Sequence, residues 1–188
     1  MKEKSAIRQD IRAHLRELPH SDIALASKKI CQHLCHAADS PISTGKTQTI
    51  ALFSAHGPEV NLTALHQLLP QTKLAYPLCH PGGILTFHHV AQPEELVSGI
   101  LGILEPVPER HDLISIPDID VFLCPGLAFG RDHTRLGQGG GFYDRALHQK
   151  SDRATTVGIA LQSQIRETVP HHTHDIHLDH VLTDQGFI

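Results

Sequence analysis

A glycine-rich stretch constrains this chain more than any other segment. Four of the five residues from 137 to 141 are glycine, and Arg135 and Arg145 flank them. Because glycine has no Cβ atom, its backbone can adopt positive φ and its N–H groups can converge on an anion. Residues 142–147 then resume a helix-compatible pattern, which places the glycines at a helix N-terminus, where unpaired N–H groups point outward. The stretch predicts a phosphate-binding loop.

Two familiar phosphate-binding loops do not fit this stretch. A Walker A loop has a Lys-Ser or Lys-Thr pair after its last glycine, whereas Gly141 is followed by Phe142 and Tyr143. A Rossmann dinucleotide fingerprint has a third glycine at the position of Phe142. A flexible loop or a sharp helix entry is the simpler alternative for consecutive glycines. The neighbouring Arg135, Tyr143 and Asp144 favour a functional loop.

Short apolar runs and amphipathic patterns alternate along the rest of the chain. Helical spacing predicts helices over residues 7–18, 21–37 and 62–69, with Ser21 as the cap of the second. Apolar runs predict strands over residues 49–53, 74–78, 84–90, 120–124, 155–161 and 181–183. Residues 92–117 contain several prolines and few regular patterns, so we expect an extended surface connection, in which a turn is the plainer interpretation of Glu105-Pro106.

This order of elements predicts an α/β fold. Strands that alternate with helices form parallel sheets with helices packed against them. We therefore expect a single Rossmann-like domain over residues 1–188, with a mainly parallel central sheet and helices on both faces. In such sheets ligands bind at the carboxyl ends of the strands. Since the strand at 120–124 leads directly into Pro125 and the glycine stretch, the phosphate loop is expected at that edge.

Composition and charge exclude several classes of partner. The chain has 188 residues, of which 40% are hydrophobic and 19% charged, as in a soluble globular protein. A formal net charge of -4 disfavours nucleic acid and anionic membranes. The N-terminus is charged, and no apolar run approaches the roughly 18 residues of a membrane span. Four cysteines show no disulfide-scaffold spacing. We expect a cytoplasmic monomer with reduced thiols.

Two neighbouring segments match a known signature. They read Pro125-Gly126-Leu127-Ala128-Phe129 and Arg135-Leu136-Gly137-x-Gly139-Gly140-Gly141-Phe142-Tyr143-Asp144-Arg145. Together they resemble the signature of the 5-formyltetrahydrofolate cyclo-ligases, also called methenyltetrahydrofolate synthetases. Weaker similarities follow the family's order elsewhere in the chain, at Lys4-x-x-x-Arg8, Gly102-Ile103-Leu104-Glu105-Pro106 and Asp175-x-x-x-Asp179.

The resemblance implies a set of site residues. ATP contacts are implied for Lys4, Arg8, Arg135, Gly137, Gln138, Gly139, Gly140, Gly141, Phe142 and Tyr143. Folate contacts are implied for Phe53, Glu59, Gly139, Gly140, Gly141 and Phe142, metal ligation for Asp144 and Asp175, and catalytic roles for Arg135 and Tyr143. Without the resemblance, the basic row of the first helix, formed by Lys4, Arg8, Arg12 and Arg16, would be a solvated flank, and Glu59 would be an ordinary loop acid. The two aspartates would then be structural acids at a turn or helix end.

The resemblance also implies a reaction. It is the ATP-dependent cyclisation of 5-formyltetrahydrofolate to 5,10-methenyltetrahydrofolate, with Mg²⁺ as cofactor and with ADP and phosphate as products. The γ-phosphoryl group of ATP would pass to the formyl oxygen, so that N10 of the folate can attack the activated carbon and expel phosphate. Phosphoryl transfer depends mainly on positioning and on neutralisation of charge.

Two other functions remain open on the sequence. A sugar-phosphate isomerase or acyl-transferring enzyme of the same architecture would act without ATP. A non-catalytic module that sequesters folate or nucleotide would bind without turnover. The joint presence of Lys4, Arg8, Arg135, Asp144 and Asp175 argues against a degenerate site.

The sequence does not decide the role of two further features. The family often has Tyr-Tyr where this chain has Phe142-Tyr143, so a hydroxyl is missing at the first position. Five histidines lie between His171 and His180, where imidazole groups could bind a transition metal. Because the chain contains 17 histidines in all, compositional bias is the stronger explanation of that cluster.

Overall fold

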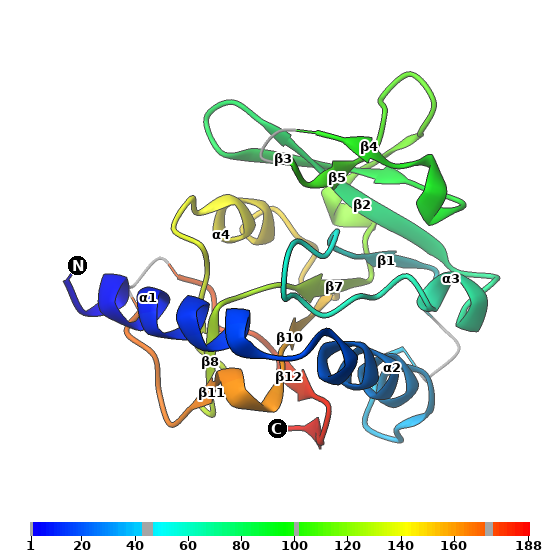
Figure 1. The fold of residues 1–188 in the computed structure, drawn as a ribbon. Helices are drawn as coiled ribbons and strands as arrows, with labels where there is room; N and C mark the ends of the chain where they lie inside the picture. The colour runs from blue at the N-terminus through cyan, green and yellow to red at the C-terminus, as the bar shows by residue number, and fades with distance from the viewer. Residues whose placement is uncertain (1, 43–46, 100–101, 172–174) are drawn as a thin grey trace.

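The computed structural model describes residues 2–42, 47–99, 102–171 and 175–188 (Figure 1). Its helices are α1 (Lys2–Glu17), α2 (His20–His36), α3 (Leu65–Leu68) and α4 (Phe142–Leu147), with 3₁₀ turns η1 (Pro93–Glu95), η3 (Ile116–Asp118) and η4 (Gln162–Gln164). Its strands are β1 (Thr49–Ala51), β2 (Lys73–His80), β3 (Ile84–His89), β4 (Val97–Ser98), β5 (Leu104–Glu105), β6 (Leu113–Ile114), β7 (Val121–Cys124), β8 (Ala128–Gly130), β9 (Arg135–Leu136), β10 (Thr155–Ile159), β11 (Ile165–Arg166), β12 (His180–Thr183) and β13 (Gly186–Phe187).

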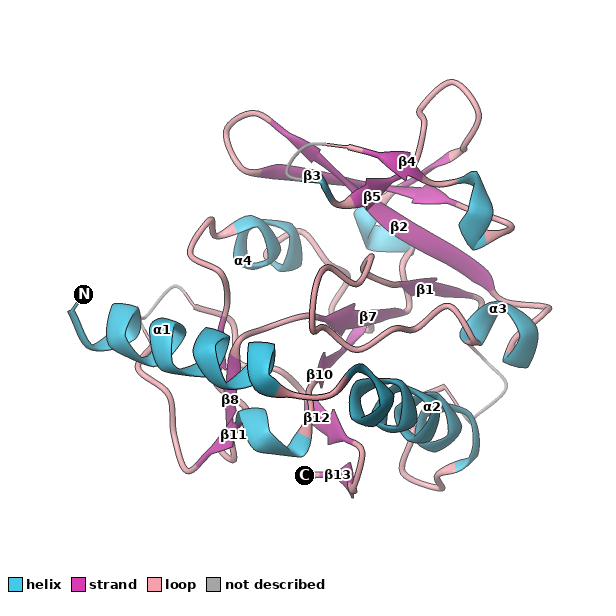
Figure 2. Cartoon of the chain, in the orientation of Figure 1, coloured by secondary structure: helices cyan, strands magenta, loops and turns pink. Residues whose placement is uncertain are grey.

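A mainly parallel sheet forms the centre of the fold (Figure 2). Within the described ranges its order is β13-β12-β10-β7-β1-β2-β3-β6. The neighbours from β12 to β2 are parallel, whereas β13, β3 and β6 run antiparallel to the strands they pair with. Two small sheets accompany it, β11-β8-β9 and β4-β5. The predicted mainly parallel sheet is confirmed.

Side chains of the parallel strands alternate between two buried clusters. In β7, Val121 and Leu123 pack with residues of α1 and α2, whereas Phe122 and Cys124 pack with residues of α4. Successive side chains of a strand point to opposite faces, so each cluster belongs to one face of the sheet. Helices therefore cover both faces, as predicted.

Two local predictions were wrong. Helix α2 begins at His20 with Pro19 as its N-cap, and Ser21 Oγ donates to the Asp22 side chain instead of capping the helix. The predicted helix over 62–69 is only the single turn of α3. The side chain of Asn61 accepts the N–H of Thr63 and holds the chain in a turn before that helix.

The region 92–117 is more regular than predicted. It contains the β4–β5 hairpin and the edge strand β6, which pairs antiparallel with β3. Glu105 lies in β5 rather than in a turn. Strands of two residues are too short to show a hydrophobic period, and the partner of β6, strand β3, lies outside this region.

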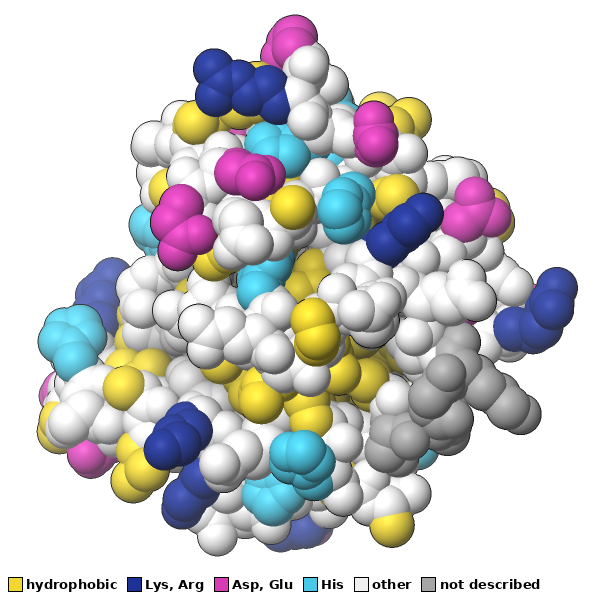
Figure 3. Space-filling view, turned by 90° about the vertical axis from the view of Figure 1, so that its right-hand side faces the viewer, with side chains coloured by type: hydrophobic (Ala, Val, Ile, Leu, Met, Phe, Trp, Pro, Cys, Tyr) yellow, Lys and Arg dark blue, Asp and Glu magenta, His cyan; other side chains and the backbone are white. Residues whose placement is uncertain are grey.

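Charged side chains of both signs are interspersed with histidines on the face at the right of Figure 1 (Figure 3). Acidic and basic groups therefore do not form a patch of one sign on that face. Among the helices of the described residues, none combines the length and apolar character needed to cross a membrane.

Candidate active site

A cavity of about 870 Å³ opens at the carboxyl ends of β1 and β7. Phe53 and Ser54, which follow β1, line it together with Pro125 and Gly126, which follow β7. This is the sheet edge at which the sequence predicts the phosphate loop. Every residue predicted for ATP, folate or metal lines this cavity, namely Lys4, Arg8, Phe53, Glu59, Arg135, Gly137, Gln138, Gly139, Gly140, Gly141, Phe142, Tyr143, Asp144 and Asp175.

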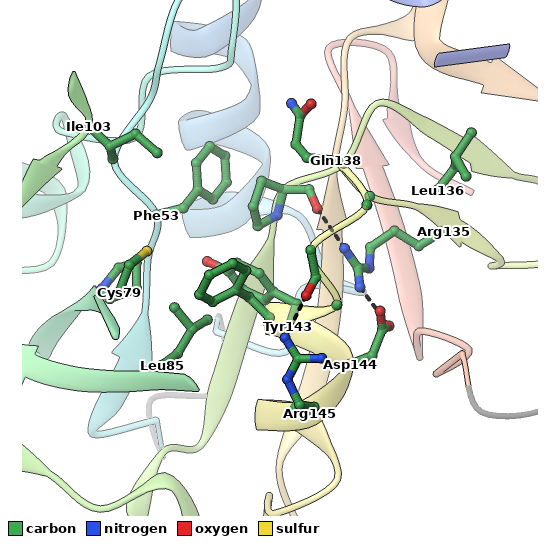
Figure 4. A pocket seen from close by; sticks show the side chains of 18 of the residues that line it. Phe53, Cys79, Leu85, Ile103, Arg135, Leu136, Gln138, Tyr143, Asp144 and Arg145 are labelled. Atoms are coloured by element: carbon green, nitrogen blue, oxygen red, sulfur yellow. Dashed lines mark hydrogen bonds and ion pairs between the residues drawn. The ribbon is translucent and has the colours of Figure 1, made fainter. Parts of the chain in front are cut away.

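One wall of the cavity is apolar (Figure 4). Its members come from the segment after β1, from β2 and β3, and from the residue before β5, and they are Phe53, Pro77, Cys79, Leu85 and Ile103. Burial raises the pKa of the Cys79 thiol to about 11, so the thiol is neutral near pH 7. This wall is suited to a flat, largely apolar ring system.

The glycine stretch forms another wall and leads directly into α4, as predicted. Gly139 and Gly141 have φ values of +109° and +65°, a region that L-residues with side chains disfavour. Gly141 is the N-cap of α4. A Cβ atom at Gly140 would lie 2.7 Å from the ring of Phe142. Glycine is therefore required at 139 and 141 by the backbone conformation, and at 140 by this close contact.

Helix α1 lies against the glycine stretch. Arg8 Nε donates to the carbonyl of Gly137 at 2.9 Å, and an Arg12 Nη donates to Gln138 Oε1 at 2.7 Å. Lys4 Nζ lies 2.7 Å from a carboxylate oxygen of Asp175. The basic row of α1 thus borders the cavity at its N-terminal end, whereas Arg16 is exposed.

Arg135 is the most constrained cation of the site. Its side chain is only 5% exposed, and one Nη donates to Asp144 at 2.7 Å. The other Nη donates to the carbonyl of Pro125 at 3.2 Å, and the guanidinium carbon lies 5.7 Å from the centre of the Tyr143 ring. Three contacts from two segments, α4 and the loop after β7, therefore fix the orientation of this guanidinium.

Three buried polar atoms at the cavity have no hydrogen-bond partner within the part of the chain that the structure describes. They are Tyr143 Oη, Arg135 Nε and Ser54 Oγ. Burial raises the pKa of Tyr143 well above 10, so its hydroxyl is a neutral donor at physiological pH. Because buried polar groups are nearly always paired in folded proteins, these atoms indicate positions where a bound ligand makes hydrogen bonds.

Glu59 lies in the loop after β1. One of its carboxylate oxygens accepts the backbone N–H of His56 at 3.0 Å. Burial outweighs this hydrogen bond and raises the pKa of the Glu59 carboxyl above its ordinary value. The loop therefore presents a partly desolvated acid to the cavity.

Comparison with known proteins assigns the family. Residues 1–184 match the 5-formyltetrahydrofolate cyclo-ligase family. The chain belongs to this family. A 5-formyltetrahydrofolate cyclo-ligase of Haemophilus influenzae is 31% identical over 180 residues, which cover 93% of this chain and 96% of that protein. A cyclo-ligase of Mycolicibacterium smegmatis is 37% identical over 92 residues, 49% of this chain and 47% of that protein.

A solved structure agrees with the family assignment. The 5,10-methenyltetrahydrofolate synthetase of Aquifex aeolicus superposes with a TM-score of 0.83 at 29% sequence identity. The superposition covers 98% of this chain and 91% of that one. The resemblance inferred from the sequence is confirmed over nearly the whole chain.

The two aspartates predicted as metal ligands are each paired with a cation in this cyclo-ligase fold. Asp144 pairs with Arg135 and Asp175 with Lys4, both at 2.7 Å. Among the described residues, no three His, Cys, Asp or Glu side chains are grouped closely enough to hold a metal ion. Of the histidine cluster, residues 172–174 lie outside the described ranges, so a metal site there stays untested.

Glu105 belongs to the site, although the sequence indicated this only weakly. This residue is 2% exposed, lines the cavity, and accepts the backbone N–H of Cys79 at 3.2 Å. The interpretation of Glu105-Pro106 as a turn was wrong, because the pairing of β4 with β5 places Glu105 against β2. The only sequence signal was the weak family match of residues 102–106. Ser54, Cys79 and Leu85 gave no signal at all.

Proposed function

We propose that this protein catalyses the ATP-dependent cyclisation of 5-formyltetrahydrofolate to 5,10-methenyltetrahydrofolate, with release of ADP and phosphate. The observation that carries the proposal is one cavity that joins an apolar wall to a cationic glycine loop. The reaction requires this combination, because the formyl group on the reduced pteridine ring must meet the γ-phosphate of ATP. The names of the relatives support the choice of substrate.

The phosphate side consists of the glycine loop and three cations. The backbone N–H groups of residues 137–141 would bind phosphate oxygens, as in other glycine-rich loops. Lys4, Arg8 and Arg135 would neutralise the negative charge that phosphoryl transfer spreads over those oxygens. Gln138 would border the nucleotide.

The folate side consists of the apolar wall and two polar groups. Phe53 and Phe142 would contact the ring system, and Glu59 would accept hydrogen bonds from its N–H groups. The hydroxyl of Tyr143 would donate to the formyl oxygen as the C–O bond breaks and that oxygen leaves with the phosphate. Its raised pKa keeps it protonated for this role.

The chemistry proceeds in two displacements. The formyl oxygen attacks the γ-phosphorus, and the bond to the bridging oxygen breaks, so that ADP leaves. N10 then attacks the formyl carbon and loses its proton, and the C–O bond to phosphate breaks. The apolar wall would exclude water, which would otherwise hydrolyse the phosphorylated intermediate.

Asp144 and Asp175 fit a magnesium ion in the chemistry of their donor atoms. Both carboxylates line the cavity, and Mg²⁺ in nucleotide sites takes one or two carboxylates together with phosphate oxygens and water. When bound, the ion would neutralise phosphate charge. Arg135 and Lys4, which pair with them at 2.7 Å, would hold the two carboxylates in place.

The test is to mix the purified protein with 5-formyltetrahydrofolate, ATP and Mg²⁺ and to follow the near-ultraviolet absorbance of the methenyl product. Controls omit ATP or the metal. Product in the complete mixture alone supports the proposal. Folate binding without turnover would indicate a sequestering module, and activity without ATP would indicate a different enzyme of the same architecture.

Other expectations concern organisation and location. The family match over residues 1–184 supports one domain over residues 1–188. A cytoplasmic location and a monomeric state stay predictions. Fractionation of cells and sedimentation equilibrium, respectively, test them.

A further inference from the structure

Arg145 connects the two sides of the cavity. It belongs to α4, yet its Nε donates to the carbonyl of Gly83 at 2.9 Å, in the turn between β2 and β3. One Nη donates to the carbonyl of Gly140 in the glycine loop. The guanidinium carbon also lies 5.8 Å from the centre of the Phe142 ring. The side chain is exposed at the rim of the cavity, where Figure 4 shows it beside Tyr143 and Asp144.

The two carbonyls that Arg145 holds belong to segments that build different walls. The turn that contains Gly83 joins Cys79 on β2 to Leu85 on β3, both in the apolar wall. Gly140 belongs to the phosphate wall. A guanidinium suits such a bridge because its N–H donors lie in one plane in fixed directions.

The hydrogen bond to Gly140 also orients the loop. No peptide bond among the described residues is cis, so the N–H of Gly141 points away from the Gly140 carbonyl that Arg145 holds. Arg8 acts in the same way on the carbonyl of Gly137, which fixes the N–H of Gln138. Two arginines thus set the directions of two loop N–H groups.

We propose that Arg145 is a positioning residue that orients the glycine loop for ATP and fixes its spacing from the folate wall. The identity of the two ligands rests on the proposed function. The bridge itself rests on the three contacts of Arg145.

Two adjacent glycines allow a matched test. Gly82 and Gly83 have φ values of +79° and +75°, so an alanine would be similarly strained at either position. A Cβ atom at Gly83 would lie 1.6 Å from an Nη of Arg145, whereas a Cβ atom at Gly82 would meet nothing within 4 Å. Only Gly83→Ala therefore displaces the guanidinium.

The experiment measures the Kd for Mg-ATP by calorimetry and the KM values for ATP and folate in the four single variants Arg145→Ala, Arg145→Lys, Gly83→Ala and Gly82→Ala. We expect Arg145→Ala and Gly83→Ala to weaken ATP binding about tenfold, because small misplacements in a positioning loop have large effects. Arg145→Lys should resemble Arg145→Ala, since an ammonium group lacks the planar fork. Gly82→Ala should bind ATP like the wild type.

A double variant and thermal unfolding complete the test. Gly83→Ala acts through Arg145, so Arg145→Ala with Gly83→Ala should bind ATP no more weakly than Arg145→Ala alone. Wild-type ATP affinity in Arg145→Ala would overturn the proposal, even if its thermal midpoint fell. Equal weakening by Gly82→Ala and Gly83→Ala would also overturn it. If the wild type shows no cyclo-ligase turnover while Arg145→Ala still weakens ATP binding, the proposed function fails and the positioning role stands.

Discussion

The carboxylate of Asp144 accepts a hydrogen bond from the guanidinium of Arg135 at 2.7 Å, across the glycine stretch that separates the two residues. Arg135 is the first residue of β9, the edge strand of the small sheet, and Asp144 belongs to the first turn of α4. The pair therefore joins the two ends of the glycine loop. With side chains 5% and 23% exposed, it is shielded enough that removal of one partner leaves a charge poorly compensated.

Asp144→Asn should lower the affinity for Mg-ATP and also destabilise the fold. We expect the free energy of unfolding to fall by about 1 to 2 kcal/mol, because a charge-assisted hydrogen bond becomes a neutral one. Calorimetry with Mg-ATP and urea unfolding measure the two effects separately. Wild-type affinity for Mg-ATP in this variant would remove Asp144 from the metal site.

Lys4→Met should raise the KM for ATP by about tenfold, the size of effect expected from one lost charge-assisted contact. Lys4 pairs with Asp175 at 2.7 Å and lines the cavity, so the variant loses both a phosphate contact and the partner of that aspartate. Arg16→Met is the matched control, because Arg16 lies in the same row of α1 but is exposed. Equal KM values in the two variants would contradict a role for Lys4.

Tyr143→Phe should reduce kcat/KM by about 100-fold while leaving stability unchanged or slightly higher. The hydroxyl is buried and, within the described residues, has no partner, so the free protein loses no hydrogen bond when it is removed. Steady-state kinetics and urea unfolding measure the two quantities. A variant that lost stability but kept full activity would show that the hydroxyl of Tyr143 has a structural role and not a catalytic one. The wild-type rate should show no ionisation of Tyr143 below pH 10, because its pKa is raised well above that value.

Glu59→Gln should change how stability depends on pH. The pKa of Glu59 is raised in the folded protein from 4.5, so the unfolded chain gives up this proton at lower pH than the folded one. The wild-type free energy of unfolding should therefore fall as pH rises from about 4.5 through the raised pKa. Above that window Glu59→Gln should be more stable than the wild type, yet bind folate more weakly. Urea unfolding at several pH values tests the first point, and identical pH profiles in both proteins would contradict it.

The local features of the site could be predicted from the sequence. Positive φ at Gly139 and Gly141 and the start of α4 at Phe142 depend on residues within a few positions of one another, and glycine is the residue that such a backbone favours. The same holds for the buried strand β7, whose apolar run leads into the loop. The resemblance to the family then indicated distant residues, among them Lys4, Glu59 and Asp175, that would join these elements at the site.

The failures of prediction involve long-range contacts or very short elements. Glu105 was assigned to a turn because a two-residue strand has no period, and only its pairing with β4 places it against Cys79. The contact of Arg145 with Gly83 joins residues 62 positions apart, and neither residue carries a pattern that indicates the other.

By itself the sequence determined the glycine stretch that leads into α4, the order of the main strands β1, β2, β3, β7, β10 and β12, and the sheet edge at which the stretch lies, because backbone conformation and alternating burial are encoded locally. Only the tertiary structure decided that Lys4 meets Asp175, that Arg145 spans the two walls, and that Tyr143 keeps an unpaired hydroxyl at the cavity. Those relations depend on how the elements pack against one another. Packing is set by the shape of the whole core rather than by any single stretch of the chain.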